Sequence, residues 1–187
     1  MRREKKERKL GKIRPPKKVK LFCGMISSEE TLFPPITEEL TSVFGSVDSM
    51  SPIMPFAQTD YYREEMGENL KKFFVSFTPL IDAVSIVDAK LFTQEIENKY
   101  SDSKGRRRIN LDPGYISEAK LVLATTKDHQ HRIYIGRGIY AEVTLKFKDK
   151  TFVTWEWTYP DYKKEEYIDY FIGVRNTLRS QLGRRET

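Results

Sequence analysis

The chain of 187 residues carries 33 basic and 27 acidic side chains, a formal net charge of +6, and a hydrophobic content of 39%. Length and composition predict one globular domain with a core of its own. Its apolar runs stay well short of the roughly 20 residues that span a bilayer. No apolar segment follows the charged N-terminus, so we expect no secretory signal. The single Cys23 cannot form an internal disulfide, which favours a reducing cytoplasm.

The positive charge is concentrated at the N-terminus. Residues 1–20 hold 11 Lys and Arg against two Glu, a charge of +9, whereas residues 21–187 hold 22 basic and 25 acidic residues, a charge of −3. We therefore expect residues 1–17 to be a disordered basic tail and residues 18–187 to form a single α+β domain. Such a charge run is more often a solubilising extension. An alternative function is a nucleic-acid-binding or partner-docking module that acts through the basic tail, because residues 1–20 could bind nucleic acid electrostatically.

Hydrophobic periodicity predicts strands and helices that alternate along the chain. From the N-terminus, the predicted elements are a strand at 18–26, a helix at 35–44, irregular chain at 46–59 with room for a short edge strand, a strand at 70–77, a helix at 84–100, strands at 121–125, 132–135, 139–147 and 151–157, and a helix at 164–182. Because the run VKLFCGMI is almost wholly apolar, we expect the first strand to be buried on both faces. The order predicts an α+β fold, a mostly antiparallel sheet with about three helices packed on one face.

A tight turn is predicted at Asp112-Pro113-Gly114. Proline at the second position and glycine at the third position are typical of a type II turn. The turn accounts for Pro113 and Gly114 but not for the polar residues around them, although capping hydrogen bonds could explain those. We assign Asn110, Asp112 and Tyr115 to a candidate ligand site.

A hairpin is predicted across Gly136-Arg137-Gly138. A three-residue loop with glycine in the left-handed conformation places Arg132 opposite Glu142. In that register the apolar residues of 139–147 share one face of the sheet with Ile133. The Arg132–Glu142 pair then fits an ordinary cross-strand ion pair on a sheet surface, as well as a role in a site.

The densest group of polar side chains lies between residues 127 and 132. Lys127, His129 and Arg132 are suited to contact an anionic, phosphate-bearing small molecule, such as a nucleotide. His129 is the best candidate for general acid–base catalysis, with Asp112 or Asp128 to orient its ring. Tyrosine and aspartate alternate in two further clusters and could stack on and hydrogen-bond a ring. The residues that we add to the ligand site from these clusters are Asp60, Tyr62 and Asp161.

A metal-dependent hydrolase is a further alternative. His129 and His131 could share one metal ion with a third ligand from Asp112, Asp128 or Glu142. The hairpin register turns His131 toward the apolar side, however, so a hydrogen-bonded histidine fits better and we assign no metal ligand. The sequence contains no P-loop, no dinucleotide-binding glycine motif after a strand and no G-x-S-x-G motif. No cofactor can therefore be named.

Several sequence blocks together resemble a known family. The blocks, in chain order, are Thr59-Asp60-Tyr61-Tyr62, Glu65-Met66-Gly67, Lys90-Leu91-Phe92-Thr93, Asn110-Leu111-Asp112-Pro113-Gly114-Tyr115, Thr126-Lys127-Asp128-His129, His131-Arg132-Ile133-Tyr134, Gly138-Ile139-Tyr140-Ala141-Glu142-Val143 and Tyr159-Pro160-Asp161-Tyr162. They are similar to a prokaryotic family catalogued as domain of unknown function 4416, from about Pro16 to Leu182. Gln94, where the family has Asn, and Pro34-Pro35, inside an expected helix, depart from it. The resemblance implies no activity and no catalytic residues.

Overall fold

A single antiparallel sheet organises the chain. The computed structural model describes residues 11–57 and 63–183, with the side chains of residues 63 and 64 left out of the description. The strands are β1 (Val19–Ser27), β2 (Val47–Met50), β3 (Met54–Pro55), β4 (Lys71–Ile81), β5 (Asn110–Ile116), β6 (Lys120–Thr125), β7 (Arg132–Gly136), β8 (Ile139–Lys148) and β9 (Thr151–Thr154). Their order is β2-β4-β1-β5-β6-β8-β7, with β3 beside β4 and β9 beside β8. The predicted α+β fold is confirmed.

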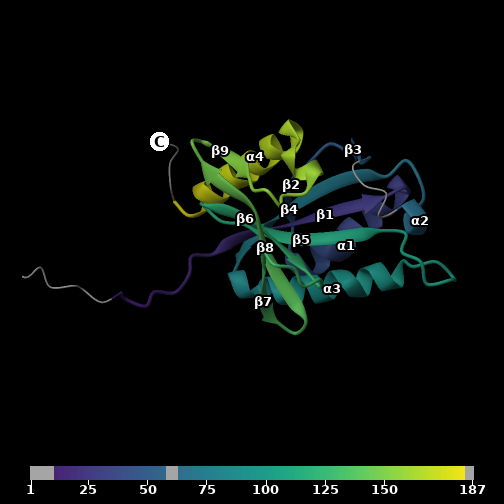
Figure 1. Cartoon of the computed structure of the whole chain (residues 1–187), viewed down its shortest axis with the longest axis horizontal. Helices are drawn as coiled ribbons and strands as arrows, with labels where there is room; N and C mark the ends of the chain where they lie inside the picture. Colours follow the sequence, from purple (N-terminus) through teal and green to yellow (C-terminus); the bar gives the residue numbers. More distant parts are fainter. Residues whose placement is uncertain (1–10, 58–62, 184–187) are drawn as a thin grey trace, which may run out of the picture.

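Helices cover both faces of this sheet, so the prediction of one covered face is wrong. The helices are α1 (Phe33–Phe44), the short α2 (Arg63–Met66), α3 (Ile86–Lys99) and α4 (Glu165–Gln181). In Figure 1, α1 and α3 lie on one side of the sheet and α4 lies on the other. The side chains of β1 show why: Leu21 and Met25 pack into the core under α1 and α3, whereas Phe22 packs under α4. A strand that is apolar on both sides must be covered on both sides.

The other elements follow the predicted periodicity closely. Helix α1 begins at Phe33, two residues earlier than expected, because Pro34 and Pro35 are tolerated in the first turn. Gly45, with φ of +88°, ends this helix as predicted. Strand β4 runs four residues past the predicted end, and the predicted last strand stops at Thr154. Among the described residues, no helix has the length and apolar character needed to cross a bilayer.

The predicted turn at Asp112-Pro113-Gly114 is wrong, because these residues belong to strand β5. Pro113 pairs with Cys23 of β1, and Gly114 is the first residue of β5 that pairs with β6. A Cβ atom on Gly114 would lie 2.6 Å from the Phe22 ring and 2.6 Å from the Val122 carbonyl oxygen. Glycine is required here by the close approach of neighbouring groups, not by a turn.

The β7–β8 hairpin has the predicted pairing of Arg132 with Glu142 but a shorter turn. Gly136 pairs with Ile139, so the loop has two residues and the extra residue forms a bulge in β7. The prediction that the apolar residues of 139–147 share one face is wrong. A second irregularity against β6 shifts the alternation of β8, so Ile139 packs under α3 and Leu145 under α4. Ile133 is 70% exposed.

Candidate functional site

The sheet splits open between β5 and β6. Strand β5 pairs with β1 from Asn110 to Ile116, but it pairs with β6 only from Gly114 to Ile116. Strand β6 meanwhile stays paired with β8 as far as Thr125. The split begins at Pro113, which has no backbone N–H to offer a neighbouring strand. Beyond this point the two strands diverge and leave a wedge-shaped space.

Two side chains of α3 satisfy the edge of β5 that the split exposes. The backbone N–H of Leu111 donates to Glu97 Oε1 at 2.5 Å, and the Leu111 carbonyl oxygen accepts from Lys90 Nζ at 2.7 Å. Glu97 and Lys90 therefore take the place of a neighbouring strand. Burial raises the pKa of the Glu97 carboxyl, although the charge of Lys90 opposes this shift.

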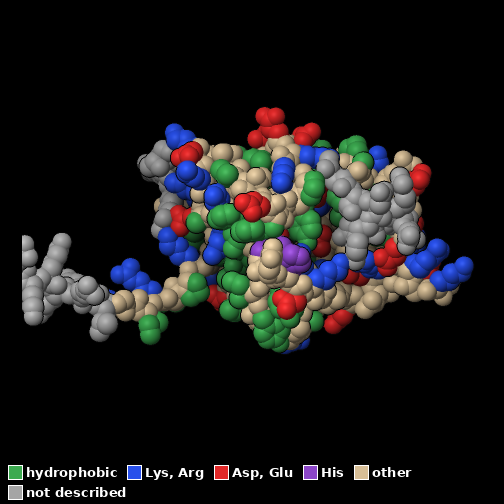
Figure 2. Space-filling model, viewed as in Figure 1, with side chains coloured by type: hydrophobic (Ala, Val, Ile, Leu, Met, Phe, Trp, Pro, Cys, Tyr) green, Lys and Arg blue, Asp and Glu red, His purple; other side chains and the backbone are tan. Residues whose placement is uncertain are grey.

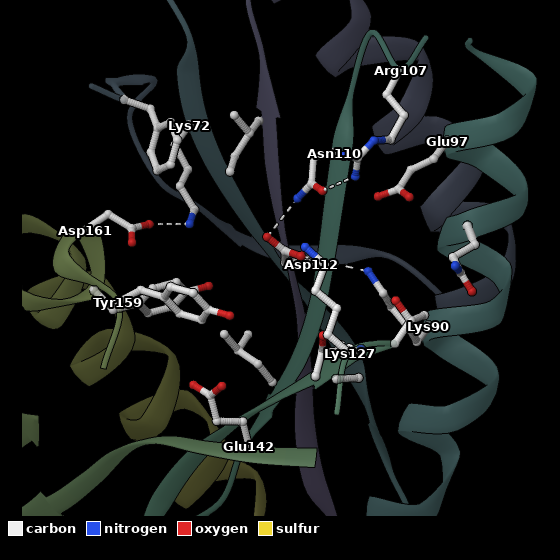
Figure 3. A pocket seen from close by; sticks show the side chains of 18 of the residues that line it. Lys72, Lys90, Glu97, Arg107, Asn110, Asp112, Lys127, Glu142, Tyr159 and Asp161 are labelled. Carbon is white, nitrogen blue, oxygen red and sulfur yellow. Dashed lines mark hydrogen bonds and ion pairs between the residues drawn. The ribbon is translucent and has the colours of Figure 1, made fainter. Parts of the chain in front are cut away.

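A pocket of about 470 Å³ fills the wedge. Its charged lining side chains come from three strands, one helix and three connecting segments, and they are Lys72, Lys90, Glu97, Arg107, Asp112, Lys127, Glu142 and Asp161. Figure 3 shows Lys72, Asp161 and Tyr159 on one side of the pocket, with Lys90, Glu97 and Arg107 on the opposite side. Charged side chains are seldom buried without a partner. The gathering of these eight charged side chains at one cavity therefore marks it as the candidate site.

On the first side of the pocket, Lys72 and Asp161 form a buried ion pair. Lys72 Nζ lies 2.5 Å from Asp161 Oδ2, and the two side chains are 2% and 6% exposed. Aromatic rings surround the ammonium group, with the Tyr162 ring centroid at 4.4 Å and that of Phe56 at 5.4 Å. The aspartate and the rings together compensate the lysine for its lost hydration.

A chain of polar contacts forms the opposite side. Asn110 Nδ2 donates to Asp112 Oδ2 at 2.8 Å, and Arg107 Nη1 donates to Asn110 Oδ1 at 3.0 Å. Arg107 also holds Glu65, which lies outside the pocket, through two of its nitrogen atoms. Asp112 lies 3.8 Å from Lys90 Nζ, too far for a hydrogen bond. These contacts fix Asn110 and Arg107 while leaving Asp112 at the pocket surface.

Arg132 forms hydrogen bonds with three residues that line the pocket. Its Nε donates to Glu142 Oε2 at 2.9 Å, its Nη1 to the Lys127 carbonyl oxygen at 3.0 Å, and its Nη2 to the Tyr159 hydroxyl at 2.5 Å. All three partners line the pocket, whereas Arg132 does not. Arg132 therefore positions the wall of the pocket. Burial raises the pKa of the Tyr159 hydroxyl, and the charge of Glu142 raises it further.

One buried polar atom at the pocket, the hydroxyl oxygen of Tyr162, has no hydrogen-bond partner among the described residues. Tyr162 lines the pocket and is 2% exposed. Its hydroxyl group is buried and makes no hydrogen bond to the described residues. Burial raises the pKa of this hydroxyl well above its usual range, and the charges of Asp112 and Asp161 add to the effect. A buried hydroxyl without a partner is costly.

The structure brings four of the predicted site residues together in this pocket. Lys127, Asn110, Asp112 and Asp161 line it. Tyr115 does not line it, because its ring packs into the core under α1 and α3, where burial raises the pKa of its hydroxyl. The predicted residues Asp60 and Tyr62 lie outside the described residues. Asp128 is exposed and does not line the pocket.

The two histidines lie on the surface beside the pocket. His129 is exposed and His131 is half-buried, and Figure 2 shows them next to each other. His131 stacks on Trp157, with ring centroids 5.3 Å apart. Neither histidine lines the pocket. Within residues 11–57 and 63–183, no group of three His, Cys, Asp or Glu side chains is arranged to hold a metal ion.

The comparison with family models bears out the sequence resemblance. The model described as "Domain of unknown function (DUF4416)" matches residues 17–178, most of the chain. The chain belongs to this family. Searches of curated proteins and of solved structures found no match to the DUF4416 chain.

Sequence reasoning missed three buried charges of the DUF4416 pocket, Lys72, Lys90 and Glu97. A signal for each is present. Lys72 shares a strand face with Phe74, at a position where periodicity calls for an apolar residue. Lys90 and Glu97 are seven residues apart and therefore lie on one face of α3, next to its apolar stripe. Charged residues at positions predicted to be buried are stronger candidates than charges in loops.

The structure describes the basic tail of the DUF4416 chain only in part. Residues 1–10 lie outside the described residues, and residues 11–18 are exposed. Of the described residues, Lys17 is the first with an ion pair to the domain, and its Nζ lies 2.7 Å from Glu118 Oε2. Binding of nucleic acid through residues 1–20 stays a prediction.

Proposed function

We propose that the pocket between β5 and β6 binds a small anionic molecule that carries a phosphate group. The observation that carries this proposal is the gathering of eight charged side chains around one cavity of about 470 Å³. That volume lies within the range of small-molecule sites. The proposal moves the predicted site from the histidines to the pocket, with Lys127, Asn110, Asp112 and Asp161 kept from the sequence prediction.

The distribution of charge favours an anion on one side of the pocket. Lys72 is neutralised by Asp161, and Glu142 is neutralised by Arg132. Arg107 is paired with Glu65, so the remaining lining charges are two lysines, Lys90 and Lys127, and two carboxylates, Glu97 and Asp112.

Protonation tilts this balance toward positive charge. Burial raises the pKa of the Glu97 carboxyl, which favours its neutral form. The Lys90 and Lys127 side of the pocket therefore supports a phosphate group, which lysine binds with charge-assisted hydrogen bonds.

The other side of the pocket suits a ring or sugar attached to the phosphate. Tyr159 and Phe56 supply aromatic surface there. A nucleotide or sugar phosphate would use both sides. The proposal includes a cytoplasmic location, supported by the buried unpaired Cys23.

The experiment is a calorimetric titration of the wild-type protein with adenosine monophosphate and, separately, with ribose 5-phosphate. The test variant is Lys127→Ala, which removes a pocket cation from a loop. Its matched control is Lys148→Ala, which removes the same charge from the far end of β8, where the side chain is 67% exposed. Loss of a charge-assisted contact worth about 1.5–3 kcal/mol lowers the affinity roughly 10-fold or more.

The control variant should bind both compounds as tightly as the wild type does. Failure of both compounds to bind, or equal affinities in Lys127→Ala and Lys148→Ala, would contradict the proposed site.

A further inference from the structure

We infer that anion binding in the pocket is coupled to the uptake of one proton by the His129–His131 pair. The inference rests on the proposed function and adds a form of control to it. The pair lies outside the pocket, but a continuous chain of hydrogen bonds joins it to the pocket wall. These are the only histidines in the chain, and histidine is the side chain that ordinarily changes charge between about pH 5 and 8.

The contacts of the pair fix the positions of its protons. His131 Nε2 lies 3.1 Å from Glu142 Oε2, and His131 Nδ1 lies 3.1 Å from His129 Nδ1. In the neutral pair, His131 must donate its Nε2–H to the carboxylate. Its Nδ1 is then an acceptor, so His129 must carry its own proton on Nδ1.

One additional proton fits this arrangement without breaking a contact. A proton from solvent adds to Nε2 of the exposed His129, and the Nδ1 proton of His129 passes to Nδ1 of His131. His131 is then a cation that donates to both Glu142 and His129. The charge of the pair rises from zero to +1, and no bond between heavy atoms forms or breaks. A second proton would leave two Nδ1–H donors facing each other, so the pair accepts one proton only.

The route from the pair to the pocket passes through Glu142. Its Oε2 accepts from His131 and from Arg132, and Arg132 also holds the Tyr159 hydroxyl and the Lys127 carbonyl. Glu142 points into the pocket in Figure 3 and is 1% exposed, so solvent screens it little.

An anion beside Lys127 adds negative charge close to the Glu142 carboxylate. The charged or titratable groups that face this corner are Glu142 on β8, Arg132 on β7, His129 and Lys127 on the connecting loop, Tyr159 before η4 (Pro160–Lys163), and Asp112 across the pocket on β5. Of these, Arg132 is already charged and cannot gain a proton. The added negative charge therefore favours the protonated form of His131, which is the nearest group able to become a cation.

The sign of the effect follows from linkage. The bound state holds the extra proton more tightly than the free state, so the anion binds more tightly as pH falls. With one proton taken up, affinity changes by up to tenfold per pH unit, because proton uptake equals the slope of log affinity against pH.

The probe is inorganic sulfate, which resembles phosphate and does not change its own charge between pH 5.5 and 8. Calorimetric titrations in two buffers with different heats of ionisation measure the number of protons taken up for each sulfate bound. We expect measurable proton uptake, of at most one proton for each sulfate bound, between pH 5.5 and 8 for the wild type and for Lys148→Ala. In His131→Gln we expect uptake near zero, with sulfate affinity at pH 8 within about twofold of the wild type.

The possible failures are distinguishable. Sulfate binding without proton uptake, or uptake that persists in His131→Gln, would overturn the coupling and leave the pocket site standing. Sulfate binding that is absent, or that Lys127→Ala leaves unchanged, would overturn the proposed function and the coupling with it.

A second measurement needs no ligand. Nitrogen NMR at pH 8 should show a proton on Nδ1 of His129 and on Nε2 of His131. Protons on Nε2 of both rings would overturn the hydrogen-bond chain.

Discussion

Replacing Gly114 with alanine should be among the most damaging single-methyl changes in this domain. The new Cβ would lie 2.6 Å from Phe22 Cζ and 2.6 Å from the Val122 carbonyl oxygen. The ring belongs to the closely packed core under α4, and the carbonyl belongs to the neighbouring strand, so neither can move aside cheaply. Overpacking of this kind costs about 1–3 kcal/mol. Two simultaneous contacts, one of them with backbone, place the cost near the upper end, about 3 kcal/mol.

The assay is urea unfolding followed by circular dichroism, with thermal unfolding as a check. A loss of about 3 kcal/mol lowers Tm by roughly 6–12 °C in a domain of this size. The matched control is Gly173→Ala in the middle of α4, where an added Cβ meets no atom within 4 Å. That change should stabilise the protein by about 0.5–1 kcal/mol, because glycine is a poor helix former. A cost below about 1 kcal/mol for Gly114→Ala would refute the close approach.

Two further predictions concern buried charges of the pocket. Asp161→Asn leaves the Lys72 ammonium buried without its partner and should destabilise the protein by about 3–5 kcal/mol in urea unfolding. Adding Lys72→Met to that variant should recover part of the lost stability, and strictly additive costs of the two substitutions would contradict the pairing. Because the folded state raises the pKa of Glu97, folding favours its protonated form, and the free energy of unfolding should fall as pH rises above about 4.5, the ordinary value. Glu97→Gln should flatten that fall between pH 4.5 and 8, and parallel curves for the variant and the wild type would count against it.

Local periodicity predicted most elements of this fold because their burial depends on nearby residues. The apolar run at 18–26 and the stripe of the last helix appear in the structure as β1 and α4. The pairing of Arg132 with Glu142 followed from the parity of one hairpin. The number of covered faces was missed although the apolar run of β1 signalled two covered faces. Which helix covers each face depends on contacts between residues distant in the sequence.

The β5 strand shows where sequence reasoning has to fail. Pro113 and Gly114 have the local preferences of a turn, yet β1 pairs with the whole of β5 and keeps both residues extended. Their actual roles depend on Phe22 and Val122, which come from other strands. Tertiary contacts overrode local propensity, and the same two residues mark the point where the sheet opens.

The candidate site was predicted in part for the same reason. Lys127, Asp112 and Asp161 could be chosen from their polar surroundings in the sequence. Lys72 and Lys90 could not be joined to them, because they come together only when β5 and β6 separate. The signal that was available, a charge at a position of apolar periodicity, indicates burial but not which cavity the charge faces.

The most direct test of the pocket as a phosphate site is a crystal structure of the protein soaked with adenosine monophosphate. We predict the phosphate group in the wedge between β5 and β6, with oxygen atoms about 2.7–3.2 Å from the Nζ atoms of Lys127 or Lys90. Adenosine monophosphate bound only elsewhere, with the wedge between Lys90 and Lys127 left without it, would contradict the account.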